Sequence, residues 1–87
     1  MKKITVSQKK VLESLVFSES YDTLLSESGL QRGELRDDLM QLINAGMIEV
    51  YHLGENTRLS GYDADNLQYF SFRATRSGLN ALKMKPI

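Results

Sequence analysis

The sequence predicts an α+β fold that is mainly α, in a single domain spanning residues 1–87. Two stretches with helical spacing of apolar residues meet at Gly29, and a third such stretch precedes them. Beyond Gly46, two runs with β character are followed by one more helical pattern. We therefore expect three helices, then a two-stranded antiparallel hairpin and a C-terminal helix.

Serines precede the first two predicted helices. Ser7 and Ser20 are each expected to accept a hydrogen bond from a free backbone N–H of the first turn. The apolar positions that follow have helical spacing: Val11, Leu12, Leu15 and Val16 in the first helix, and Tyr21, Leu24 and Leu25 in the second.

The segment from Leu24 to Val50 predicts a helix, a tight turn, a longer helix and a strand. Gly29 can adopt the left-handed backbone that a sharp helix-to-helix turn needs. Gly46 is expected to end the longer helix with a positive φ, and Met47 to fold back on the preceding turn in a Schellman motif. The buried stripe of this helix recurs at i, i+4 and i+7: Leu35, Leu39 and Leu42.

Two β-type runs follow the third helix. The first run extends from Met47 to Leu53, and the second extends from Leu67 to Ala74 and is rich in aromatic residues. They are expected to pair as an antiparallel hairpin around a loop of residues 53–66. Thr75 is then placed to cap the last helix, whose apolar face contains Leu79 and Leu82.

These motifs, taken together, resemble the winged helix-turn-helix superfamily of small bacterial transcriptional regulators, in the broad MarR/PadR-like sense. The resemblance is carried by the turn 28–30, the leucine stripe, the helix exit 44–48 and the segment 74–79, which is similar to the L-T-x-x-G entry of the helix after the wing. It implies a winged helix-turn-helix domain with a recognition helix at about 31–45 and a wing loop at 53–66. Gln31 departs from the family, which often places Ser, Thr or Asp at the cap of this helix.

Composition excludes several other classes of protein. The apolar fraction is 41%, there is no cysteine, and no apolar run is long enough for a signal peptide or a membrane span. His52 has no second metal ligand nearby. The segment that begins at Asp63 and Asp65 resembles a calcium-binding loop but lacks the glycine and the glutamate that such a loop needs. We find no catalytic set. We therefore expect a cytoplasmic protein that is not an enzyme and carries no cofactor and no metal.

Charge is distributed unevenly although the net charge is zero. Residues 1–10 and 68–87 contain no acidic side chain, and all of the carboxylate side chains lie between them. The basic side chains of these two ends are Lys2, Lys3, Lys9, Lys10, Arg73, Arg76, Lys83 and Lys85. If the ends meet in the fold, they form a basic patch; otherwise they are two ordinary solvated faces.

The third helix is the predicted DNA-binding element. At about 100° per residue, the side opposite the leucine stripe collects Gly33, Asp37, Met40, Gln41 and Asn44, with Arg32, Arg36 and Ile43 on one flank and Glu34 and Asp38 on the other. In a major groove, Gln41 and Asn44 could read adenine and Asp37 a cytosine amine. Arg32 and Arg36 would contact phosphates, and Gly33 would let the helix start approach the backbone. Arg58 is the candidate phosphate or minor-groove contact in the loop, or else a free surface arginine.

The same helix also allows a second interpretation. Its predicted DNA-facing side has no cation, although phosphate attraction usually supplies much of the affinity for nucleic acid. Met40 and Ile43 could instead contact another protein, or simply pack against the wing. The alternative to double-stranded DNA as the partner is therefore a winged-helix protein–protein interaction module that does not bind DNA.

The apolar residues near both chain ends predict self-association. They exceed what one small core needs: Ile4, Val6, Leu79, Leu82, Met84 and Ile87. We expect a homodimer in which two recognition helices are spaced by about 34 Å, one turn of DNA.

Overall fold

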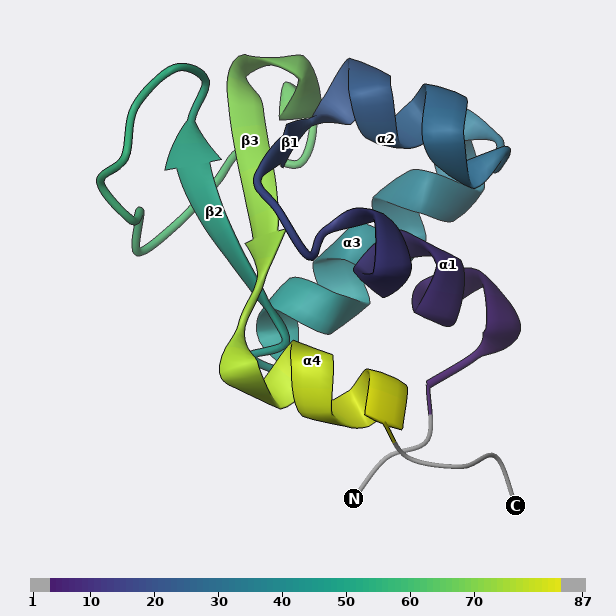
Figure 1. Cartoon of the computed structure of the whole chain (residues 1–87). Helices are drawn as coiled ribbons and strands as arrows, with labels where there is room; N and C mark the ends of the chain where they lie inside the picture. Colours follow the sequence, from purple (N-terminus) through teal and green to yellow (C-terminus); the bar gives the residue numbers. More distant parts are fainter. Residues whose placement is uncertain (1–3, 84–87) are drawn as a thin grey trace.

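Four helices and a three-stranded antiparallel sheet are found in residues 4–83, the part of the chain that this computed structural model describes. Figure 1 shows the sheet along one side of the molecule, with helices packed against one face of it. The elements follow in the order α1 (Val6–Ser14), β1 (Glu19–Ser20), α2 (Tyr21–Ser28), α3 (Arg32–Asn44), β2 (Ile48–His52), the short 3₁₀ helix η1 (Leu67–Tyr69), β3 (Phe70–Ala74) and α4 (Arg76–Lys83).

Helix α1 begins earlier than the sequence suggests. Its cap is Thr5 rather than Ser7: Thr5 Oγ1 accepts from the Gln8 backbone N–H, and Gln8 Oε1 accepts from the Thr5 N–H. This reciprocal pair satisfies two free donors, whereas a serine alone satisfies one. The helix ends at Ser14, so the prediction that Val16 lies on its apolar face is wrong, and Val16 is exposed.

The segment from α2 to β2 confirms the predicted helix, turn, helix and strand. Ser20 caps α2 through the Thr23 N–H, and Gly29 ends it with a φ of 69°. Helix α3 closes in a Schellman motif, in which the Met47 N–H donates to the Leu42 carbonyl at 2.9 Å and the Gly46 N–H donates to the Ile43 carbonyl at 3.0 Å. Gly46 has a φ of 77°, as predicted.

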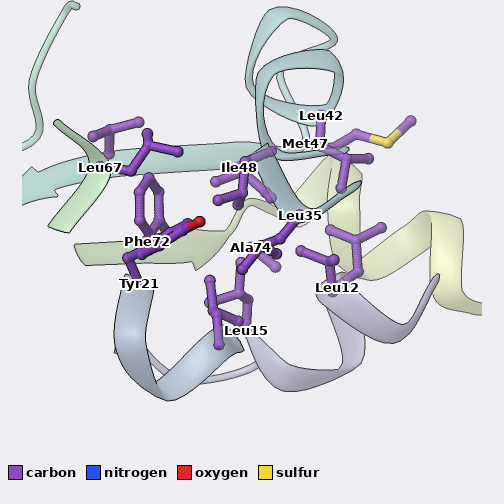
Figure 2. Close-up of a cluster of buried hydrophobic side chains, with 14 of the residues drawn as sticks. Leu12, Leu15, Tyr21, Leu35, Leu42, Met47, Ile48, Leu67, Phe72 and Ala74 are labelled. Atoms are coloured by element: carbon purple, nitrogen blue, oxygen red, sulfur yellow. The ribbon is translucent and has the colours of Figure 1, made fainter. Parts of the chain in front are cut away.

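The core lies between the sheet and the first three helices. Figure 2 shows Leu12 from α1, Leu15 just after α1, Leu35 from α3 and Phe72 from β3 in one cluster of buried side chains. The predicted stripe of α3 is confirmed, since its three leucines are at most 2% exposed. The largest fully buried side chains are Val11, Leu12, Leu15, Leu24, Leu35, Leu39, Leu42 and Phe72.

The sheet has one more strand than predicted. Strand β1 pairs with β3, which also pairs with β2, giving the antiparallel order β1-β3-β2. The two residues of β1 carry no strand pattern, because their pairing depends on a partner about fifty residues later. The second predicted run is also shorter: residues 67–69 form η1, Tyr69 is 62% exposed, and the strand begins at Phe70.

Helix α4 is joined to the turn that ends α3. The Thr75 N–H donates to the Met47 carbonyl at 2.9 Å, and the Thr75 hydroxyl donates to the Gly46 carbonyl at 2.7 Å. The same hydroxyl accepts from the Gly78 N–H and caps α4, as predicted. Gly78 is buried against this turn, so close to it that a Cβ at this position would collide with the Met47 backbone oxygen.

The two basic ends of the chain come together in part. Helices α1 and α4 contact each other in Figure 1, and Lys9, Lys10 and Lys83 are exposed on them. Of the residues expected in a dimer interface, Val6 is 76% exposed, while Ile4, Leu79 and Leu82 are half-buried against the core. The other predicted residues at the ends lie outside the described residues: Lys2, Lys3, Met84, Lys85 and Ile87.

Replacing Leu39 with alanine should lower the free energy of unfolding by about 2–5 kcal/mol. Leu39 is fully buried in the middle of the α3 stripe, so the change leaves a cavity in the core. Urea denaturation followed by circular dichroism measures the loss. Val6→Ala on exposed α1 surface is the control and should change stability by less than about 0.5 kcal/mol. Equal effects in the two variants would contradict the burial of this stripe.

Replacing Gly78 with alanine should destabilise the fold by about 1–3 kcal/mol, because the new methyl group collides with backbone rather than with a flexible side chain. Gly33→Ala is the matched control within a helix, since a Cβ there meets no atom within 4 Å. The control should gain up to about 1 kcal/mol from helix propensity. Thermal melts of both variants give the comparison, and a stabilised Gly78→Ala protein would refute the close approach.

Candidate nucleic-acid interface

Helix α3 presents one face to solvent because its opposite face is held in the core. Gly33, Asp37 and Asn44 are exposed on this outer face, as the helical spacing predicts. Gln31 stands at the N-cap and makes no side-chain cap bond, so the first backbone N–H groups of the helix lack that partner. Glu34 lies in the same first turn and places a negative charge beside them. The exposed face is therefore polar, with its carboxylates near the amino end.

Gln41 has a structural partner. Its Oε1 accepts a hydrogen bond of 2.7 Å from Nε2 of Gln8, which is buried on α1. A bidentate contact with adenine needs both polar groups of the amide. Gln41 would have to give up this link between α1 and α3 to read a base. Asn44, by contrast, makes no side-chain hydrogen bond with residues 4–83 and is exposed.

The flank with Asp38 is not a solvated surface. Asp38 on this flank is only 8% exposed. Asp38, which the helical spacing places on a flank of α3, is therefore buried rather than solvated. Its Oδ2 atom is buried without a hydrogen-bond partner in the described part of the chain. The helical spacing gave the angle of this residue on α3 but could not show that neighbouring parts of the fold bury it.

Arg36 is bound to the loop formed by residues 53–66. Its Nε donates to the Ala64 carbonyl at 3.2 Å, and its Nη2 lies 3.4 Å from Asp65 Oδ1. These contacts join α3 to the loop and reduce the availability of Arg36 for a phosphate. Arg32 is exposed and forms no ion pair within residues 4–83. Of the two arginines predicted on this flank, Arg32 is thus the freer.

The loop 53–66 folds back along β2. Arg58 forms an isolated bridge with Tyr51, and the Leu59 N–H donates to the Val50 carbonyl at 2.8 Å. The Arg58 side chain is 71% exposed, and its Nη1 lies 3.9 Å from Glu49 Oε1. Arg58 is therefore held near β2 by its backbone while its guanidinium remains largely in solvent.

The structure brings Asn44 and Arg58 to the same hollow. This hollow, of about 380 Å³, lies between the carboxyl end of α3, β2 and the loop. Ile43 and Tyr62 contribute apolar parts of its wall, and both also pack against the core. Two predicted site residues that are 14 positions apart in the chain thus share one surface.

Two of the minor motifs have local structural roles. Asp63 accepts from the Asp65 backbone N–H and from Asn66 Nδ2, and the hydrogen bond from Asn66, followed by the backbone bond, lowers the pKa of Asp63. His52 stacks on Phe70 with ring centroids 5.6 Å apart. Within residues 4–83, no group of three potential ligands is placed to hold a metal ion.

The outer face of the sheet contains charged residues that the sequence did not single out as a site. Glu49 on β2 lies directly across from Arg73 on β3, and Glu49 Oε2 accepts a 2.7 Å bond from the Tyr51 hydroxyl. A second hollow, of about 540 Å³, continues from this face to α4, where Arg76 and Lys83 line it. The acid-free run 68–87 was the sequence signal for this surface, but the run did not show which side chains share a face.

Comparison with known proteins finds no match to a family model, to a curated protein or to a solved structure. The described helices include none that combines the length and apolar character of a membrane span. The geometry of these surfaces consequently carries the functional argument.

The pKa of Tyr51 should fall in a Glu49→Gln variant. In the native protein the hydrogen bond to Glu49 raises this pKa above its ordinary value of 10.0, helped by burial and by the Glu49 charge, while Arg73 and Arg58 oppose the shift. The stability from this bond is therefore present below the unfolded pKa and is lost as pH rises through the raised folded pKa.

An NMR titration of ¹³C-labelled tyrosine between about pH 8 and 12 measures the Tyr51 pKa. Glu19→Gln, on the far edge strand β1, removes the same charge and should leave the titration of Tyr51 unaltered. An unchanged Tyr51 pKa in Glu49→Gln would exclude the negatively charged Glu49 carboxylate as the cause of the raised value.

Proposed function

We propose that the chain is a DNA-binding winged-helix transcriptional regulator, in which α3 enters the major groove and the loop 53–66 lies on its flank. The proposed role is non-enzymatic and involves no cofactor. An exposed helix on a rigid scaffold is the usual means of reading base edges. Here the scaffold consists of the leucine stripe of α3 and the Schellman turn that ends it.

The observation that carries this proposal is the shared hollow of Asn44 and Arg58. The Asn44 amide would contact an adenine edge, which carries sequence information, and the Arg58 guanidinium would contact a phosphate, which does not. A base edge and a backbone phosphate lie within one groove width of each other in DNA. Both side chains are exposed in the unbound protein, so neither has to break a strong contact before it binds. Arg32 and Gly33 would add contacts at the amino end of α3.

Contacts within the protein make two of the other candidate residues less available to DNA and leave a third exposed. Gln41 is tied to Gln8 and supports the position of α3 more directly than it reads a base. Arg36 would act by holding the loop against α3. Asp37 remains an exposed acceptor suited to a cytosine amine.

A protein-interaction module is the second candidate function. The loop 53–66 exposes Asp63 and Asp65. Asp65 forms an ion pair with Arg36, which makes this cation less available to a DNA phosphate. Such a surface would favour a basic protein partner over phosphate. Met40 is half-buried beside Asp37 and offers an apolar contact, whereas Ile43 already packs against the core.

The regulator is proposed to act as a homodimer. Exposed Val6 on α1 and the partly buried leucines of α4 would lie near a two-fold axis. Such a dimer would present two copies of α3 about one DNA turn apart.

Arg58→Ala should weaken duplex binding on all sequences and reduce the slope of log Kd against log salt by about one unit, since it removes one phosphate contact. Asn44→Ala should instead lower the preference for the best site by about 1–3 kcal/mol and leave the salt slope unchanged. Fluorescence anisotropy with labelled duplexes, preceded by selection of a preferred site from a random pool, measures both quantities.

Met40→Asp separates the two candidate functions. For the regulator, duplex binding by the wild-type protein persists at physiological salt, and Arg58→Ala weakens it. For the interaction module, duplex binding is negligible and Met40→Asp abolishes capture of a protein partner. Detectable duplex binding that neither Arg58→Ala nor Asn44→Ala alters would show that the contact surface lies elsewhere.

A further inference from the structure

Four cations follow one another across the outer face of the sheet and helix α4. They are Arg58, Arg73, Arg76 and Lys83, and we refer to them as the cationic strip. The strip starts at the hollow beside the carboxyl end of α3 and continues into the 540 Å³ hollow next to α4. Glu49 lines both hollows, so the two are adjacent. The strip is therefore one continuous surface built from the loop, two strands and a helix.

Arg73, Arg76 and Lys83 are all exposed, and within residues 4–83 none of them lies within ion-pair distance of a carboxylate. Glu49 is the one acid lining the two hollows, and its carboxylate already accepts from Tyr51 and lies near Arg58. Arg58 and Arg73 both lower the pKa of Tyr51, which places their positive charges near the same hydroxyl. The surface is thus a row of positive charges with a single, partly buried negative charge between them.

Spacing along α4 suits an extended polyanion. Arg76 and Lys83 are seven residues apart, so they lie on the same side of the helix and about 10 Å apart along its axis. One strand of B-DNA carries a phosphate for about every 3.4 Å of its axis, so this interval spans about three phosphates. Asn80 lies between the two cations in the same hollow and can donate to a phosphate oxygen.

We propose that the cationic strip binds the sugar-phosphate backbone of double-stranded DNA and supplies the salt-dependent part of the affinity. The choice of DNA as ligand rests on the proposed function, in which Arg58 already takes part, but Arg73, Arg76 and Lys83 are separate from the base-reading face of α3. Three of the four cations are arginines, whose planar guanidinium groups match phosphate in a bidentate geometry. The weak cationic character of the α3 face is compensated by this neighbouring surface.

An anionic membrane fits the strip less well. The exposed large apolar side chains of the described chain, which could insert into lipid, line neither hollow: Val6, Val16, Phe17, Leu53 and Tyr69. A single small anion would need fewer cations than a row that crosses four elements.

The test compares the salt dependence of binding to a random-sequence duplex of about 30 base pairs. Removing two phosphate contacts in Arg73→Ala/Arg76→Ala should reduce the slope of log Kd against log salt by about two units. Lys9→Ala/Lys10→Ala is the matched control, since it removes the same charge from exposed α1 residues that line neither hollow. This control should leave the slope nearly unchanged.

Glu49→Gln provides a gain of function that misfolding cannot imitate. The amide of the new side chain can still accept from Tyr51, but the substitution removes the negative charge between the cations. Duplex binding should therefore tighten by about two- to five-fold at low salt. Equal slopes in the two double variants, weaker binding by Glu49→Gln, or binding to phosphatidylserine vesicles without binding to duplex would each overturn the proposal.

The same measurements separate this inference from the proposed function. If Arg73→Ala/Arg76→Ala and Glu49→Gln leave duplex binding unchanged while Asn44→Ala alters sequence preference, the cationic strip does not bind DNA and α3 remains the base-reading element. If the strip double variant flattens the slope and Asn44→Ala changes no preference, the strip stands and α3 is not the reading element. Absence of duplex binding by the wild-type protein contradicts both.

Discussion

The contact between the turn at Gly46–Met47 and the start of α4 at Thr75 is the constraint on which the rest of the structure depends. Two carbonyl groups at the end of α3 accept from the backbone and the side chain of Thr75, and Gly78 lets α4 approach without a Cβ. The end of α3, the start of β2, the end of β3 and the cap of α4 therefore meet at one point. Because the turn also sets the direction of β2, it determines how the outer face of α3 is oriented relative to the loop 53–66.

Local features of the fold could be predicted from the sequence because their causes are local. Gly29 and Gly46 have the positive φ values that their positions require, and the leucine stripe of α3 is buried as its spacing indicates. The errors arise where the cause lies elsewhere in the chain. Strand β1 exists only through its pairing with β3, and the close approach at Gly78 depends on a backbone oxygen about thirty residues earlier.

The candidate site shows the same division at the level of side chains. A helical wheel identified which residues of α3 face outward, and Asn44 and Asp37 are exposed accordingly. It could not reveal that Gln41 is tied to Gln8, that Arg36 is held by residues 64 and 65, or that Asp38 is buried. Nor could a net charge of zero indicate that cations gather on the sheet and α4 while carboxylates lie near the start of α3. Charge separation of this kind is a property of the folded surface.

The arrangement of the sheet also affects how copies of the protein can meet. An edge strand with free main-chain donors and acceptors invites a strand from another molecule, which is a route to fibrils. Here one edge is β1, which offers only two residues, and the other edge is β2, along which the chain returns through Arg58 and Leu59. Neither edge offers a long row of unpaired main-chain donors and acceptors. Association between copies would consequently proceed through side-chain surfaces, with the cross-β route to aggregation disfavoured even at the high local concentrations of a crowded cell.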